Sequence, residues 1–148
     1  MTRSVSPRNI VVYADDDVDD LLLVKEAFSS YSNNVDLITL NNGAEALSYL
    51  KHLLEHDTIP CLIILDINMP KLDGKETLIK VRQIPELQTV PVILFTTSSQ
   101  QMDRKFAHAN NAGFITKPID FQQMDKIANK FIDHCSEEVQ KNIRKYLE

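Results

Sequence analysis

Short apolar runs alternate along this chain with longer stretches in which apolar residues recur every three or four positions. Each run is long enough for a strand and too short for a membrane-spanning helix. Runs that lack polar alternation are typical of strands buried on both faces, as in a parallel sheet. We therefore predict strands over residues 10–14, 35–40, 61–66, 90–95 and 113–116.

The stretches between these runs have the spacing of amphipathic helices. The clearest carries Ala46, Leu47, Leu50 and Leu53 on one face. We predict helices from Asp19 or Asp20 to about residue 28, over 44–56, over 74–84, from one of the serines at 98–99 to about 109, and from about 120 to 132. Five strands alternating with five helices predict an α/β fold, a doubly wound five-stranded parallel sheet with helices on both faces.

A sixth amphipathic segment follows from Ser136, with acidic residues early and basic residues late, as a helix dipole favours. We predict a C-terminal helical extension over residues 135–148 that packs on the domain or builds a homodimer. Its apolar face comprises Val139, Ile143, Tyr146 and Leu147. Residues 1–9 form a polar leader, and 10–134 form one domain of ordinary size.

Composition narrows the class of protein. A net charge of −5 over 148 residues, with no basic run, argues against nucleic acid as a partner. Two cysteines, Cys61 and Cys135, are too few for a disulfide framework and fit a reducing compartment. With neither a signal peptide nor a membrane-length apolar segment, we expect a cytoplasmic protein without a membrane partner.

Chemically active side chains follow four of the predicted strands. They are Asp15 with Asp16, Asp66, Thr96 and Lys117. The carboxyl ends of parallel strands meet at one edge of the sheet, where ligands bind. Carboxylates so close would repel by about 4 kcal/mol per pair at an effective dielectric near 20, so a cation must offset them. Mg²⁺ suits such oxygen ligands, and a hydroxyl, an ammonium group and a metal around Asp66 predict phosphoryl transfer to that carboxylate.

Four motifs resemble response-regulator receiver domains of two-component signalling, the CheY-like family, from about Ile10 to His134. They are VVYADDD at residues 11–17, LIILDINMPKLDG at 62–74, PVILFTTS at 91–98 and FITKP at 114–118. Four motifs in family order are far more specific than any one of them. The resemblance implies the strand order 2-1-3-4-5. The extended C-terminus resembles that of small stand-alone receivers of the type that partners cyanobacterial phytochromes.

The resemblance also implies roles for individual residues. Asp66 would accept a phosphoryl group from a sensor histidine kinase or phosphotransfer protein. Mg²⁺ or Mn²⁺ would be bound by Asp16, Asp66 and the backbone carbonyl of Asn68, with Asp15 acting through water. Lys117 would bind a phosphoryl oxygen, and its peptide bond to Pro118 would be cis.

A conformational switch would carry the signal. Thr96 would move to bond the phosphoryl group, and Phe114 would move inward with it. A downstream protein would bind the face near Ser99–Asn110, Phe114 and Asp120–His134. Such a protein is a phosphoacceptor and not an enzyme.

Two other functions remain open. One is an aspartate-nucleophile phosphohydrolase, which would need a D-x-D-x-[TV] arrangement. The stretch from Asp15 to Asp19 ends in the wrong residue for it, and the stretch after Asp66 lacks the second acid. The other is an interaction module that keeps the fold without being phosphorylated.

Two further motif matches are weak. His52, Glu55 and His56 fit the H-x-x-E-H pattern of zinc peptidases but lie on a predicted helix without a clear third ligand. The acids from Asp15 to Glu26 fit a calcium loop only if the glycine that such a loop requires is ignored.

Overall fold

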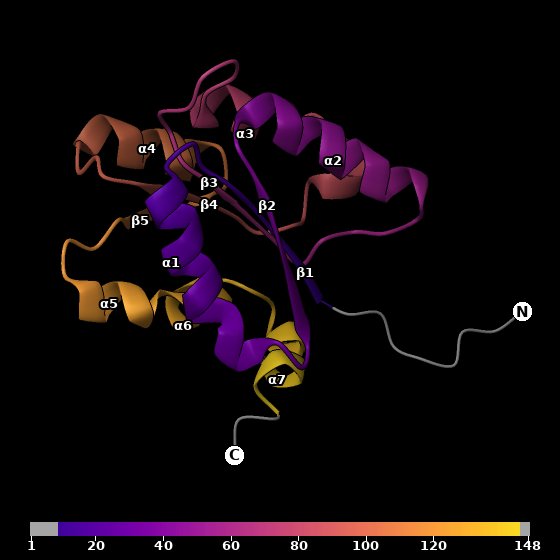
Figure 1. The fold of residues 1–148 in the computed structure, drawn as a ribbon. Helices are drawn as coiled ribbons and strands as arrows, with labels where there is room; N and C mark the ends of the chain where they lie inside the picture. Colours follow the sequence, from indigo (N-terminus) through magenta and orange to yellow (C-terminus); the bar gives the residue numbers. More distant parts are fainter. Residues whose placement is uncertain (1–8, 146–148) are drawn as a thin grey trace, which may run out of the picture.

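A central parallel sheet is covered by helices on both of its faces in the computed structural model, which describes residues 9–145 (Figure 1). The strands are β1 (Asn9–Ala14), β2 (Val35–Leu40), β3 (Leu62–Leu65), β4 (Val92–Thr96) and β5 (Gly113–Thr116). The helices are α1 (Val18–Phe28), α2 (Gly43–Glu55), α3 (Gly74–Arg82), α4 (Gln101–Ala109), α5 (Phe121–Asp125), α6 (Ile127–Ile132) and α7 (Glu137–Arg144). Two short 3-10 turns, η1 (Ser29–Tyr31) and η2 (Pro85–Leu87), follow α1 and α3.

The strand order is β2-β1-β3-β4-β5 with every neighbouring pair parallel, so the predicted sheet is confirmed. Ala14 pairs with Leu65, and Thr96 pairs with Thr116. The residues that directly follow these four therefore meet at one edge of the sheet.

Alternate side chains of each strand enter two separate cores. Val11, Tyr13, Ile64 and Phe95 pack with α1, α5, α6 and α7 on one face. The opposite face, which carries Val12, Leu65 and Leu94, packs with α2, α3 and α4. Because β3 and β4 are buried on both faces, they read in the sequence as unbroken apolar runs.

Several helix ends differ from the sequence predictions. α1 begins at Val18, because the Asp17 carboxylate caps it by accepting from the backbone N–H groups of Asp19 and Asp20. Leu22 on this helix is 60% exposed, whereas Val24, Ala27 and Phe28 are buried. No serine caps α4; the Ser98 hydroxyl instead bonds the Asp103 carboxylate one turn into the helix. These local contacts follow from the position of each turn, which apolar periodicity does not define.

The predicted helix after Asp120 is two helices. Asp120 caps α5 as expected, but Lys126 separates α5 from α6. Met124, Ile127 and Phe131 still enter one core. The apolar face therefore continues across the break, which explains why its periodicity resembled that of a single helix.

The C-terminal segment forms α7 and packs on the domain, one of the two predicted arrangements. Ile143 is 1% exposed and belongs to the core beneath α1 and α6. The Asn142 side chain accepts from Asn9 Nδ2 at 2.6 Å, and its backbone carbonyl accepts from the side chain of Asn34. Tyr146 and Leu147, also predicted on this face, lie outside the described residues.

Candidate functional site

The register of the sheet brings the strand-end residues predicted from sequence together. The Asp66 N–H donates to the Ala14 carbonyl at 3.0 Å, which places Asp66 beside Asp15. On the other side of β3, the Lys117 N–H donates to the Thr96 carbonyl at 2.7 Å. Asp15, Asp66, Thr96 and Lys117 are all buried, whereas Asp16 is exposed.

The Lys117 ammonium group is the positive centre of this cluster. Its Nζ lies 2.8 Å from Asp15 Oδ2, 2.8 Å from Asp20 Oδ2 and 3.4 Å from Asp66 Oδ2. Burial lowers the pKa of Lys117, but hydrogen bonds to Asp15 and Asp20 outweigh that effect and raise it above its ordinary value. Lys117 is therefore a permanent cation at the sheet edge.

Two residues of the cluster were missed from sequence. Asp20 was taken for an ordinary first-turn acid of α1, yet its carboxylate bonds Lys117 across the site. Tyr13 was taken for a core residue, yet its hydroxyl donates to Asp15 Oδ2 at 2.6 Å. Burial beside Asp15 raises the pKa of Tyr13, so this phenol remains a donor. A tyrosine two residues before a site aspartate was the one available signal, because alternate strand residues share a face.

The carboxylates of Asp15 and Asp66 differ in the hydrogen bonds that they accept and in their exposure to solvent. Asp15 is 0% exposed and accepts three hydrogen bonds, from the Asp17 N–H, the Tyr13 hydroxyl and Lys117. Asp66 has the longer contact with Lys117 and retains 6% exposure. Of the two buried carboxylates, Asp66 is the one that an incoming group can reach.

The electrostatics of Asp66 set its proton affinity. Burial, together with the neighbouring Asp15 carboxylate, raises the pKa of Asp66 to about 7, although Lys117 acts in the opposite direction. The uncompensated charge of the cluster is therefore negative near neutral pH. A bound cation would relieve it.

The three carboxylates fit a hard divalent cation. Asp15, Asp16 and Asp66 each present an oxygen, and these oxygens lie within 4.8 Å of one another. Oxygen ligands are those that Mg²⁺ and Mn²⁺ prefer, and Mg²⁺ retains waters at its remaining positions. Asn68, predicted to add its backbone carbonyl, lies two residues beyond Asp66 with an exposed side chain, and its role stays a prediction.

The turn after Asp66 depends on Gly74. A Cβ at Gly74 would lie 2.1 Å from the Asp66 carbonyl oxygen, and the Gly74 N–H donates to the Ile67 carbonyl at 2.8 Å. Asp73 caps α3 directly before it. The start of α3 therefore lies directly against the backbone that carries Asp66.

The two predicted switch residues lie on adjacent strands. Thr96 is fully buried, and its hydroxyl accepts from the Ser98 N–H at 3.3 Å. Phe114 is half-buried beneath the Arg104 guanidinium group, 4.7 Å from the ring centroid. The aromatic ring is therefore held between β5 and α4.

A second network holds the loop between Thr96 and α4. Asp103 is 8% exposed and bonds both the Ser98 hydroxyl and the Lys75 ammonium group, each at 2.5 Å. Lys75 comes from the first turn of α3, so α3 and α4 are tied through one carboxylate. Lys75 and Ser98 lower the pKa of Asp103, which keeps it ionised.

The predicted cis bond between Lys117 and Pro118 is not present. No peptide bond among residues 9–145 is cis, so this bond is trans. The two isomers of a bond before proline differ by only about 0.5–1 kcal/mol in intrinsic preference. The sequence motif therefore does not decide the isomer, and in the trans form Lys117 already reaches its three acidic partners.

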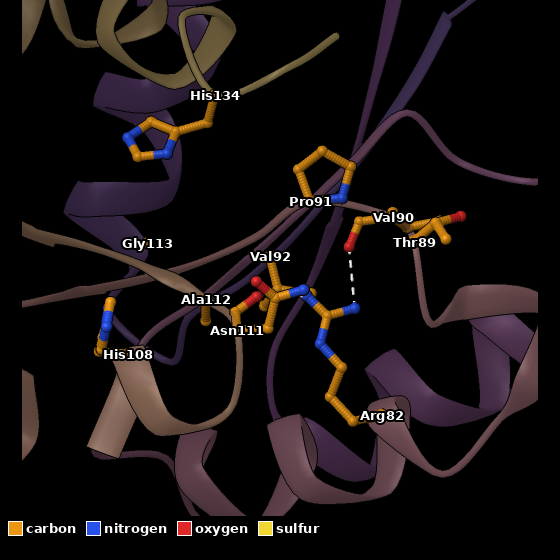
Figure 2. A pocket seen from close by; sticks show the side chains of 10 residues that line it. All are labelled: Arg82, Thr89, Val90, Pro91, Val92, His108, Asn111, Ala112, Gly113 and His134. Atoms are coloured by element: carbon orange, nitrogen blue, oxygen red, sulfur yellow. Dashed lines mark hydrogen bonds between the residues drawn. The ribbon is translucent and has the colours of Figure 1, made fainter. Parts of the chain in front are cut away.

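A pocket of about 420 Å³ lies away from these carboxylates, where β4 and β5 begin (Figure 2). Arg82 lines it, but its guanidinium group donates to the carbonyls of Val90 at 2.9 Å and Asn111 at 2.7 Å. Arg82 thus holds two loops in place, and we do not assign the phosphoryl chemistry to this pocket.

Among the described residues, no side chain is placed to join His52 and His56 as a third zinc ligand. His52 lies on α2 and His56 directly follows that helix, with their ring centroids 4.5 Å apart. Within residues 9–145, the group of three or more side chains placed to share a metal is Asp15, Asp16 and Asp66. In the same part of the chain, no helix is both long and apolar enough to cross a membrane.

Known proteins are similar to this chain in sequence and in fold. The chain matches the response regulator receiver domain over residues 11–129. Response regulator Rcp1 of Synechocystis sp. is 33% identical over 105 residues, which cover 70% of this chain and 71% of Rcp1.

Two solved structures are similar at 28% identity. One is the phosphorylated cyanobacterial phytochrome response regulator RcpA, with a TM-score of 0.77 over 84% of this chain and 91% of RcpA. The other is the Mn²⁺-bound form of Rcp1, with a TM-score of 0.73 over 95% of each chain.

The fold and the site define a signalling protein of the two-component class. Within that class, the chain belongs to the response regulator receiver domain family. Receiver domains accept phosphoryl groups from histidine kinases and signal to downstream targets, and this phosphoacceptor role is the function of the chain.

Binding of Mg²⁺ is expected to weaken as the pH falls below about 7. The raised pKa of Asp66 means that the metal-free protein holds a proton there below pH 7, and the cation must displace it. The apparent affinity should fall by about tenfold per pH unit below that value and level off above it. Calorimetric titration with Mg²⁺ across this range checks the result, and an affinity that stays constant between pH 5.5 and 7 would contradict it.

Proposed function

We propose that Asp66 is the phosphoacceptor of this receiver domain. The observation that carries the proposal is the difference between the Asp15 and Asp66 carboxylates in hydrogen bonding and in exposure. Asp15 is fully buried and accepts three hydrogen bonds, while Asp66 retains exposure with the Lys117 ammonium group 3.4 Å away. A carboxylate must be ionised and accessible to attack phosphorus.

In the proposed reaction, an oxygen of Asp66 attacks the phosphorus of a phosphohistidine on a sensor kinase or phosphotransfer protein. A new P–O bond forms, the P–N bond breaks, and the leaving imidazole takes up a proton. Lys117 neutralises charge on the transferred phosphoryl oxygens. Asp15, Asp16 and Asp66 would hold Mg²⁺ or Mn²⁺, which when bound supplies further positive charge to those oxygens.

The surface beside the site suits a protein donor. Val18 and Leu22 on α1 are 65% and 60% exposed, and Ile119, two residues after Lys117, is fully exposed. Apolar side chains near a site of buried charge favour docking of another protein over free access by a small metabolite. We propose that the partner docks here, in the cytoplasm.

The proposed output is a switch at Thr96 and Phe114, with no catalytic turnover. The Thr96 hydroxyl would bond the phosphoryl group, and Phe114 would move from beneath Arg104 toward the space that Thr96 leaves. The contact between Arg104 and the Phe114 ring supports this proposal, because it is the interaction that such a movement breaks. The face of α4, β5 and α5 would then change, and would bind a downstream protein or a second copy of the chain.

Incubation with phosphoramidate and Mg²⁺ tests the phosphoacceptor. The wild type and Asp125→Asn, which neutralises an exposed acid on α5, should each gain about 80 Da by intact mass. Asp66→Asn should gain nothing, because an amide is not a nucleophile toward phosphorus. Equal gain by the wild type and Asp66→Asn would reject the assignment.

The same samples test the switch. Phosphorylation of the wild type should shift the backbone amide signals of α4 and β5 in NMR spectra. Thr96→Ala should still gain the phosphoryl group, with much smaller shifts. Shifts of equal size in both proteins would remove Thr96 from the switch.

A further inference from the structure

The two cysteines of the chain, 74 positions apart, are neighbours in the fold. Cys61 lies directly before β3, and Cys135 lies in the short connection between α6 and α7. Cys135 Sγ is 3.8 Å from the Cys61 carbonyl oxygen, and both cysteines line the same pocket. Both are present as free thiols.

The thiols can be reached from outside. An open pocket of about 410 Å³ is lined by both cysteines together with Pro60, Ser136 and Val139. Pro91 and His134 line this pocket too, and the same two residues also line the neighbouring pocket shown in Figure 2. Cys61 is half-buried and Cys135 is 6% exposed. A small oxidant can therefore reach both thiols through this pocket.

The surroundings favour Cys135 as the thiolate. The neighbouring Cys61 thiol and the Arg144 guanidinium group lower the pKa of Cys135, and together they outweigh burial, which acts in the opposite direction. The same pairing raises the pKa of Cys61, which therefore keeps its proton. Arg144 is held by Asp133 Oδ1 at 2.8 Å and Asn129 Oδ1 at 2.7 Å, so its charge has a defined position.

We propose that Cys61 and Cys135 form a peroxide-responsive dithiol site. The Cys135 thiolate attacks hydrogen peroxide, takes one oxygen to become a sulfenic acid, and releases hydroxide, which leaves as water after protonation. Cys61 sulfur then attacks the sulfenic sulfur, and the hydroxyl group leaves with the Cys61 proton as a second water. Two thiols are thus oxidised to one disulfide while one peroxide is reduced to two waters.

The disulfide would join the C-terminal segment to the sheet. Cys135 immediately precedes Ser136, whose hydroxyl caps α7 by accepting from the Val139 N–H. In the reduced protein, α7 is held by the buried Ile143 and by hydrogen bonds of Asn142 and Arg144, none of them covalent. A covalent link from Cys135 to the start of β3 would keep the beginning of α7 in place. The link lies at the opposite end of β3 from Asp66, so phosphorylation does not depend on it.

Hydrogen peroxide, added to the reduced full-length protein at low concentration, tests the site. Native wild type should lose both titratable thiols, lose about 2 Da and stay monomeric on a non-reducing gel. Peptide mapping should show the segments around Cys61 and Cys135 linked. Dithiothreitol should restore both thiols.

Single variants separate the two roles. Cys61→Ser should accumulate a sulfenic acid at Cys135 that dimedone traps, because its resolving partner is gone. Cys135→Ser should react at least tenfold more slowly, because the remaining thiol keeps its proton. An intermolecular disulfide, or oxidation of the native wild type no faster than of the urea-unfolded chain, would overturn the proposal. Phosphoryl uptake by the oxidised protein should equal that of the reduced protein, so this test is independent of the one at Asp66.

Discussion

Replacing Lys117 with methionine is expected to lower the unfolding free energy of the metal-free protein by about 3–5 kcal/mol. Methionine keeps an unbranched apolar side chain but removes the charge that contacts Asp15, Asp20 and Asp66. Asp15 is 0% exposed, so its carboxylate would be left buried beside other acids with no cation. Urea unfolding followed by circular dichroism in EDTA measures the loss.

The control for this change is Lys80→Met, which removes an exposed charge from α3 and should change stability by less than about 0.5 kcal/mol. Adding Asp15→Asn to Lys117→Met should recover part of the loss, because the uncompensated buried charge is then gone. Mg²⁺ should stabilise Lys117→Met more than it stabilises the wild type, since a bound cation would replace the missing one. Equal urea midpoints for Lys117→Met and the wild type would show that Lys117 does not hold the cluster together.

Replacing Gly74 with alanine is expected to destabilise the protein by about 3 kcal/mol and to weaken Mg²⁺ binding by at least about tenfold. The added Cβ would lie 2.1 Å from the Asp66 carbonyl oxygen and 2.8 Å from the Ile67 Cα. Both obstacles are backbone atoms, so the collision can be relieved only by displacing the segment that carries Asp66. Urea unfolding and calorimetric Mg²⁺ titration at pH 8 measure the two effects.

Gly113→Ala is the matched control. Its Cβ would meet the ring of His134, an exposed side chain that can rotate away, so the loss should stay below about 1 kcal/mol with Mg²⁺ binding unchanged. Helix propensity alone favours alanine over glycine by about 1 kcal/mol, so a stabilised Gly74→Ala would mean that the close approach to Asp66 is not maintained.

The sheet and the principal site residues were predictable from sequence because their signals are local. The run from Leu62 to Leu65 is apolar at every position, since β3 is buried on both faces. A polar residue that ends such a strand must lie at the sheet edge, whatever the precise packing. That rule was sufficient to predict that Asp15, Asp66, Thr96 and Lys117 lie close together.

Other features of the site and the fold depend on contacts between segments that are far apart in the sequence. Asp20 could bond Lys117 only because α1 brings it across 97 positions of sequence, and nothing near Asp20 indicates that partner. The isomer of the bond before Pro118 is a small energy difference that the surroundings decide. The same applies to Cys135, whose neighbour Cys61 is evident only from the fold.

The amino-acid sequence by itself determined the alternation of strands and helices and the sheet edge at which Asp15, Asp66, Thr96 and Lys117 lie. These follow from periodicity and strand-end position, which are properties of neighbouring residues. Only the tertiary structure decided that Asp15 is fully buried while Asp66 stays accessible, that Tyr13 and Asp20 complete the cluster, that α7 packs on the domain, and that the two cysteines are neighbours. Each of these depends on side chains packed from distant segments, where a displacement of about one ångström decides whether a hydrogen bond forms.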